Sequence, residues 1–144
     1  MKISVYLLVF IAVVCLESSG QTADSVKYKS LKPHDFNLAY LKDSNAVLID
    51  VREYFECKKS RIKNAINIPS SGNIDIAADT INKDIPLYIY CTSGYRAKKV
   101  CARLADKGFT KLYNLEGGIN AWKEEGLPVE KKRLKGTRAQ RRKG

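Results

Sequence analysis

Residues 87–97 read Leu-Tyr-Ile-Tyr-Cys-Thr-Ser-Gly-Tyr-Arg-Ala, an apolar run followed at once by a short polar loop and the start of a segment with helical spacing. The run Leu87–Tyr90 is apolar at nearly every position, which is typical of a strand covered on both faces of a sheet. After the loop, Tyr95–Lys107 places one set of apolar residues on a single helical face, namely Ala97, Val100, Cys101, Leu104 and Ala105. This stretch predicts a strand, a loop and an amphipathic helix, in that order.

The same alternation extends to both sides of this unit. Strands are predicted at Val47–Val51, Ala65–Ile68, Leu87–Tyr90 and Lys111–Leu115. Helices are predicted at Pro33–Lys42, Glu53–Lys59, Ile74–Ile81, Tyr95–Lys107 and Ile119–Glu125. Strands that alternate with helices favour parallel pairing, because each helix carries the chain back across the sheet. We therefore predict a three-layer α/β domain with a central, mainly parallel sheet flanked by helices.

Chain length and composition limit the classes of function. The 144 residues suffice for one ordinary domain, which we place at residues 25–130. The 26 lysines and arginines outnumber the 15 aspartates and glutamates, for a formal net charge of +11. The single histidine, His34, excludes sites that need two, such as a His-Glu-x-x-His zinc site. The four cysteines include no Cys-x-x-Cys pair, so we expect neither a metal nor another cofactor.

The first twenty residues have the pattern of a secretory signal peptide. A positive residue near the start precedes Ile3–Leu16, a nearly unbroken apolar run of 14 residues. A membrane-spanning helix needs about 20 such residues, whereas the core of an export signal needs about 7 to 15. Cleavage after Gly20 would leave Gln21 at the start of a periplasmic or secreted protein. The alternative is a lipoprotein anchored to a membrane through Cys15.

The chain ends in a basic segment, residues 131–144. It contains eight lysines and arginines, no acidic residue and almost no apolar side chain. Such segments are usually disordered, because they have little to bury. We expect a solvated extension, or an electrostatic contact with an anionic surface, and a chain ending at Glu130 should keep its activity. Because an exported protein meets little nucleic acid, no nucleic-acid partner is expected.

Cys91 stands where the buried strand ends and the helix is about to begin. The carboxyl edge of a parallel sheet is where α/β proteins bind ligands, and a helix N-terminus there offers unpaired N–H groups and a positive dipole end. These features and the cation of Arg96 favour the thiolate, so we expect the pKa of Cys91 to lie below its ordinary value of about 8.5. No general base is then needed, which disfavours a thiol hydrolase dependent on the distant His34.

The residues after Cys91 have the composition of an anion-binding loop. Gly94 allows a tight turn, and the small residues Thr92 and Ser93 add hydroxyl groups. A cysteine in an arbitrary position is more often a small buried hydrophobe. The position of Cys91 beside Gly94 and Arg96 favours a reactive role instead.

The segment Cys91–Arg96, Cys-Thr-Ser-Gly-Tyr-Arg, resembles the Cys-x-x-Gly-x-Arg active-site loop of the single-domain rhodaneses, sulfurtransferases that carry sulfur as a cysteine persulfide. Three further segments resemble motifs of that family and occur in the family's order: Val47–Glu53, Ala65–Pro69 and Leu115–Trp122. The sequence departs from the family at Asn64, where a glycine is usual. The resemblance extends from about Ser30 to about Val129.

This resemblance implies a rhodanese-like fold and a two-step transfer of sulfur. Cys91 would be the catalytic nucleophile and take the outer sulfur of thiosulfate, or of a similar small donor, as a persulfide. Cyanide or a thiol would then accept that sulfur, and a sulfur-acceptor protein is a further candidate partner. The loop residues would bind the substrate, with Arg96 holding the sulfonate of the donor; they are Thr92, Ser93, Gly94, Tyr95 and Arg96. We expect a monomer.

Loop length separates this interpretation from related chemistries. Four residues lie between Cys91 and Arg96, whereas the related phosphatases and arsenate reductases use Cys-x5-Arg, which is one residue longer. A cysteine-dependent phosphatase or arsenate reductase is therefore disfavoured. A non-enzymatic persulfide carrier or anion-binding module stays open, and it would combine low turnover with a stable persulfide.

Four other residues receive structural interpretations. Cys101 falls on the apolar face of its helix, so we predict that it packs in the core. Cys57 is expected at the surface or in the core, and pairing with another cysteine is left open. Removal of the signal peptide would leave three cysteines, so at least one should stay free. Asp50 and Arg52 follow a buried strand, where charged side chains need partners.

Overall fold

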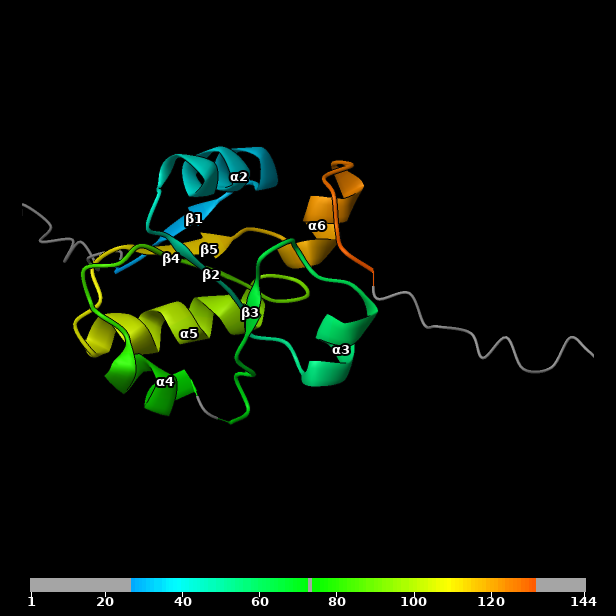
Figure 1. The fold of residues 1–144 in the computed structure, drawn as a ribbon. Helices are drawn as coiled ribbons and strands as arrows, with labels where there is room; N and C mark the ends of the chain where they lie inside the picture. The colour runs from blue at the N-terminus through cyan, green and yellow to red at the C-terminus, as the bar shows by residue number, and fades with distance from the viewer. Residues whose placement is uncertain (1–26, 73, 132–144) are drawn as a thin grey trace, which may run out of the picture.

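The structure, a computed structural model, describes residues 27–72 and 74–131 (Figure 1). The predicted signal peptide with Cys15, and the basic segment beyond Lys131, lie outside the described residues. The helices and strands are β1 (Lys29–Leu31), α2 (Pro33–Lys42), β2 (Val47–Asp50), α3 (Tyr54–Lys59), β3 (Ile66–Asn67), α4 (Ile74–Thr80), β4 (Leu87–Tyr90), α5 (Tyr95–Asp106), β5 (Leu112–Leu115) and α6 (Gly118–Glu124).

The five strands form one parallel sheet in the order β1-β5-β4-β2-β3. β4 lies in the middle, where Ile89 is in register with Ile49 of β2 on one side and with Asn114 of β5 on the other. All four residues of β4 are buried. The predicted α/β class with a parallel central sheet is confirmed, and Cys91 follows the central strand directly.

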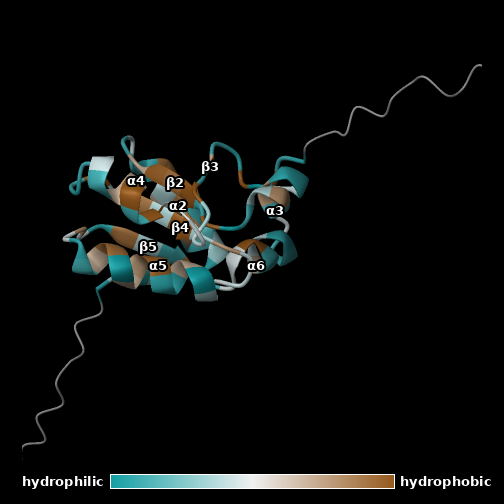
Figure 2. Ribbon diagram, turned by 90° about the horizontal axis from the view of Figure 1, so that it is seen from below, coloured by the Kyte–Doolittle hydropathy of each residue, from teal (hydrophilic) through white to brown (hydrophobic). Residues whose placement is uncertain are grey.

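Helices cover both faces of the sheet, as Figure 1 shows. One apolar core lies between the sheet and the pair α4 and α5, and a second lies between the sheet and the pair α2 and α6. Leu87 and Ile89 of β4 point into the first core, whereas Tyr88 and Tyr90 point into the second. Figure 2 shows the apolar residues gathered in the strands, with hydrophilic residues on the helices around them. The two cores together hold β4 rigidly in place.

The C-terminal segment after α6 is fastened to the loop that follows α3. Arg61 and Glu130 form an isolated antiparallel bridge, in which the Arg61 N–H donates to the Glu130 carbonyl (2.9 Å) and the Glu130 N–H donates to the Arg61 carbonyl (2.8 Å). Nε of Arg61 also donates to the Glu130 carboxylate at 3.2 Å. Before this bridge, the indole N–H of the buried Trp122 donates to the carbonyl of Pro128 at 3.0 Å. The segment therefore returns to the α3 side of the domain.

Three details differ from the sequence-based expectations or refine them. β1 was not predicted, because Lys29–Leu31 is a short edge strand with two exposed residues and no apolar run. α3 begins at Tyr54 because Glu53 is its N-cap, with a backbone N–H that donates to the Glu56 carboxylate at 3.2 Å. Asn64 has a φ of +66°, a left-handed conformation that asparagine tolerates better than most residues. None of the helices in the described part of the chain has the length and apolar character needed to cross a membrane.

Candidate active site

Cys91 lies buried at the carboxyl end of β4, where the chain turns into the twelve-residue helix α5. The turn is made at Gly94, whose φ of +89° lies in the left-handed region that favours glycine. The Gly94 N–H donates to Sγ of Cys91 at 3.1 Å. A Cβ on Gly94 would lie 3.0 Å from the carbonyl oxygen of Leu115. Conformation and space therefore both require glycine at this position, and the sulfur lies where the α5 dipole favours negative charge.

A second glycine turn, before α6, holds the Cys91 loop from the other side. The Ile119 N–H donates to the Cys91 carbonyl at 2.9 Å, and the Asn120 N–H donates to the Thr92 carbonyl at 3.2 Å. A Cβ on Gly118 would lie 2.5 Å from the Cys91 carbonyl oxygen, closer than any real contact. Gly118 thus packs closely against the loop that carries Cys91, whereas a Cβ on Gly117 would clash with the side chain of Ala121.

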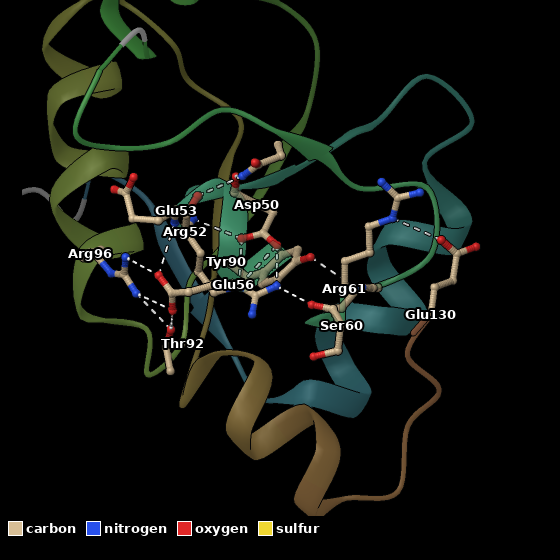
Figure 3. A network of polar contacts seen from close by, with 12 residues as sticks. Asp50, Arg52, Glu53, Glu56, Ser60, Arg61, Tyr90, Thr92, Arg96 and Glu130 are labelled. Atoms are coloured by element: carbon tan, nitrogen blue, oxygen red, sulfur yellow. Dashed lines mark hydrogen bonds and ion pairs between the residues drawn. The ribbon is translucent and has the colours of Figure 1, made fainter. Parts of the chain in front are cut away.

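Thr92 and Arg96 are both bound by Glu56, which reaches them from α3 (Figure 3). Nη1 of Arg96 donates to Oε2 of Glu56 at 3.0 Å, and Nη2 donates to Oε1 at 3.1 Å. The Thr92 hydroxyl donates to Oε1 of Glu56 at 2.7 Å and accepts from Nη2 of Arg96 at 2.9 Å. The hydrogen bond from Arg96 lowers the pKa of Glu56 from its ordinary value of 4.5 to about 2. The carboxylate therefore stays charged and fixes Arg96 beside the Cys91 loop.

Arg96, which we expected to hold the sulfonate of a sulfur donor, is already paired with Glu56. The guanidinium already makes a two-pronged contact with Glu56, and about a third of the side chain (34%) is exposed. Of the other predicted loop residues, Ser93 and Tyr95 are exposed, and Gly94 donates its N–H to Sγ of Cys91. Nζ of Lys99 lies over the ring of Tyr95, 4.6 Å from the ring centroid.

Glu56 is the residue that sequence reasoning missed. It lies 40 positions before Arg96, so local spacing does not connect the two. A signal was present, because Glu56 is an acidic residue in the first turn of the predicted helix Glu53–Lys59. The structure brings this turn against the Cys91 loop because β2 and β4 are neighbours in the sheet and end at the same edge.

Asp50 and Arg52 are each other's partners next to the site. Nη2 of Arg52 donates to the Asp50 carboxylate at 2.6 Å and also to the Ser60 carbonyl at 2.6 Å. Both side chains are almost completely buried, and Asn67 donates to the backbone carbonyls of both residues. This buried pair fixes the end of β2 and the start of α3. It serves the geometry of the site without contact to the sulfur in the described structure.

The remaining cysteines and the histidine lie outside this loop. Cys101 is completely buried on the side of α5 that faces the sheet, where it packs in the core as predicted. Burial raises its pKa to about 12. Cys57 is also buried, and burial raises its pKa as well. Cys57, Cys91 and Cys101 are free thiols. The exposed His34 lies 3.7 Å from the Glu125 carboxylate, on the surface formed by α2 and the end of α6.

Comparisons with known proteins agree with the fold and with this loop. The Rhodanese-like domain family matches residues 33–125. Among curated relatives, a tRNA uridine(34) hydroxylase of Hamiltonella defensa is 34% identical over 108 residues, which cover 69% of this chain and 30% of that protein. A protein of the same name from Erwinia tasmaniensis is also 34% identical, over 69% of this chain and 31% of its own length. The chain thus spans about three-tenths of the length of these relatives.

Solved structures show the same architecture. A rhodanese-related protein from Thermoplasma volcanium has a TM-score of 0.60 at 30% identity, covering 72% of this chain and 98% of that one. A rhodanese-like domain protein from Staphylococcus aureus has a TM-score of 0.61 at 32% identity, covering 71% of this chain and 98% of that one. The family match covers well over half of the chain and includes strands β2 to β5 and both glycine turns. The chain therefore belongs to the rhodanese-like domain family.

Proposed function

We propose that this protein is a sulfurtransferase that works through a persulfide on Cys91. The observation that carries the proposal is the Gly94 N–H, which donates to Sγ of Cys91 at 3.1 Å at the N-terminus of α5. A main-chain donor and a helix dipole stabilise negative charge on a sulfur atom without needing a side-chain base. The same donor can serve the thiolate before reaction and the persulfide after it.

The reaction has two displacement steps. The Cys91 thiolate attacks the outer sulfur of thiosulfate, the sulfur–sulfur bond of the donor breaks, and sulfite leaves with the electron pair of that bond. A thiolate or cyanide then attacks the outer sulfur of the persulfide, and the bond between the two sulfur atoms breaks. The second step returns Cys91 as a thiolate, so atoms and charge balance without a redox partner.

The Glu56–Arg96 pair supports sulfur transfer over phosphate chemistry. A loop that holds a phosphate ester needs an arginine free to present both donors to the anion. Here both guanidinium nitrogens, Nη1 and Nη2, are bonded to Glu56. An anion would have to displace that carboxylate, whose low pKa of about 2 keeps it charged. Thiosulfate meets the same carboxylate only until sulfite leaves, and the persulfide that stays on Cys91 carries no oxyanion for Arg96 to hold, whereas a phosphoenzyme would keep its tetrahedral anion in the loop.

Mass spectrometry of the full chain tests the proposal. Incubation with thiosulfate should add the mass of one sulfur atom to the protein, and cyanide should remove it as thiocyanate. Cys91→Ser should abolish both changes. Cys101→Ala is the matched control, because it removes a second buried thiol of the same core without touching the loop. Retention of the added sulfur by Cys91→Ser would refute the assignment.

The names of the relatives support a second candidate, a role in hydroxylation of uridine 34 in tRNA. Its basis is the 34% identity to proteins named for that reaction. The candidate is secondary because the matched part is about three-tenths of those proteins. Incubation of the full chain with unmodified tRNA in air-saturated buffer, where dissolved oxygen supplies the oxidant, followed by nucleoside analysis, distinguishes the two. Hydroxylated uridine formed without any Cys91 persulfide would favour this candidate over sulfur transfer.

A further inference from the structure

A cavity of about 530 Å³ opens on the side of α3 away from Arg96 and Thr92. Its walls come from α3, from the loop and strand that follow it, and from the end of the described chain at Glu130 and Lys131. None of its lining residues belongs to the loop Cys91–Arg96. Figure 3 shows Arg61 and Glu130 on one side of the buried Asp50–Arg52 pair and Arg96 on the other. Binding here is therefore a question separate from sulfur transfer.

The charge of the walls favours an anion. Three basic side chains line the cavity, Lys58, Arg61 and Lys131, against the single carboxylate of Glu130. That carboxylate already accepts a hydrogen bond from Nε of Arg61 at 3.2 Å. Positive charge is thus in excess, and the cavity volume lies within the range of about 300 to 1,000 Å³ typical of small-molecule sites.

Tyr54 adds a flat apolar wall to this positive site. This residue is 62% exposed, and Nζ of Lys58 lies 4.5 Å from the centre of its ring. Asn67 lines the cavity as well, and its amide nitrogen already donates to the carbonyls of Asp50 and Arg52. The side-chain oxygen of Asn67 is the other polar atom of that amide. An aromatic surface beside a cation and an amide oxygen suits a ring with N–H groups that carries a phosphate.

The basic segment begins at this cavity. The bridge between Arg61 and Glu130 fastens the chain at the cavity wall, and Lys131 is the next residue. Residues 132–143 add seven further lysines and arginines and no acidic residue. An oligonucleotide carries more negative charge than a single nucleotide, and a chain with a formal net charge of +11 attracts it more strongly.

We propose that this cavity binds a nucleotide, either free or within a single nucleic-acid strand, with the base against Tyr54 and the phosphate near Lys58, Arg61 and Lys131. The cavity is concave and lined mostly by polar side chains, so it suits a nucleotide better than the surface of a membrane. The proposal departs from the expectation of no nucleic-acid partner, which depended on the predicted export.

The helix α3 supplies a matched pair of controls. Tyr54 and Lys58 line the cavity. Phe55 and Lys59 are a second exposed aromatic residue and lysine on the same helix, with Nζ of Lys59 6.0 Å from the ring centroid, and neither lines the cavity. Equivalent substitutions in the two pairs therefore remove the same kinds of side chain, once inside the cavity wall and once outside it.

The experiment measures fluorescence anisotropy of two probes with the full chain: ribose-labelled ADP and a labelled single-stranded oligouridylate. Lys58→Glu and Tyr54→Ala should each weaken binding of labelled ADP about tenfold, the loss typical of one stacked base or one close charge contact. Lys59→Glu and Phe55→Ala should change it less than about twofold. The oligouridylate should bind more tightly than ADP, and raised salt should reduce that advantage.

Four results would overturn the proposal: no binding of labelled ADP, equal losses in both pairs, oligouridylate binding that the Tyr54 and Lys58 substitutions leave unchanged, or binding to phosphatidylglycerol vesicles alone. Cys57 gives a readout without any substitution in the walls, since it lines the cavity. Saturating ADP should slow alkylation of Cys57 in the native protein, followed by peptide mass spectrometry. Persulfide formation on Cys91 should stay intact in all four variants, so failure of this proposal and failure of the sulfurtransferase proposal are distinguishable.

Discussion

Replacement of Glu56 by glutamine tests whether the pair with Arg96 holds the Cys91 loop in place. Glu56→Gln keeps the shape of the side chain and removes its charge, so Arg96 loses its counterion. A pKa lowered from 4.5 to about 2 corresponds to roughly 3 kcal/mol of stabilisation for a pair sheltered from water. About a third of Arg96 is exposed, and solvent screening reduces that figure. We expect Glu56→Gln to lower the free energy of unfolding by about 1 to 2 kcal/mol at pH 7.

The stability difference between wild type and Glu56→Gln should depend on pH in a defined direction. Because the pKa of Glu56 is lower in the folded state than in the unfolded state, its stabilisation is fully present above about pH 4.5 and is lost as the pH falls toward 2. Urea unfolding at a series of pH values, followed by circular dichroism, should therefore show a difference between wild type and Glu56→Gln that shrinks with acidification. The exposed Glu124→Gln is the control and should match wild type throughout. A difference that is absent at pH 7, or unchanged at the lowest pH, would refute the reasoning.

Three further expectations concern the loop and the two ends of the chain. Gly118→Ala should cost at least about 2 kcal/mol of stability and slow persulfide formation, because its Cβ would lie 2.5 Å from the Cys91 carbonyl oxygen. The control is Gly126→Ala, because Gly126 has a similar positive φ and a Cβ there would have no atom within 4 Å. This control should cost about 1 kcal/mol in the same urea titration and leave sulfur transfer unchanged. If export operates, N-terminal sequencing of the protein from its native cell should begin at Gln21, and an intact N-terminus in the cytosolic fraction would contradict it. A chain ending at Glu130 should keep the full rate of thiocyanate formation from thiosulfate and cyanide, and a large loss would give the basic segment a part in sulfur transfer.

The central elements could be predicted from the sequence because their signals are local. Leu87–Tyr90 is an uninterrupted apolar run, and the helix after it has a single apolar face, so β4 and α5 fall within a residue of their predicted bounds. The turn between them was predictable because Cys91 and Gly94 lie only three positions apart in sequence. β1 carried no such pattern, since it gains its place only by pairing with β5 at the edge of the sheet.

The partners of the loop could not be predicted because they come from distant parts of the chain. Glu56 meets Arg96 only after β2 and β4 have paired, and its role depends on that geometry rather than on its neighbours in sequence. The cavity beside α3 needs the contact between Arg61 and Glu130, which are 69 positions apart. Contacts of this kind form only when the whole domain has packed. The sequence therefore shows which residue types are present but not which of them pair.

The bond from Trp122 to Pro128 gives the domain a built-in optical probe. Trp122 is the sole tryptophan of the chain, it is buried, and its indole N–H holds the segment that leads to Glu130. Its emission therefore comes from one defined place in α6, against the C-terminal strap, which is the segment of residues 125–130 that follows this helix. Detachment of that strap would let water reach the indole and shift the emission to longer wavelength before the sheet itself unfolds. Intrinsic fluorescence and far-ultraviolet circular dichroism should thus separate loosening of the C-terminal strap from loss of the fold.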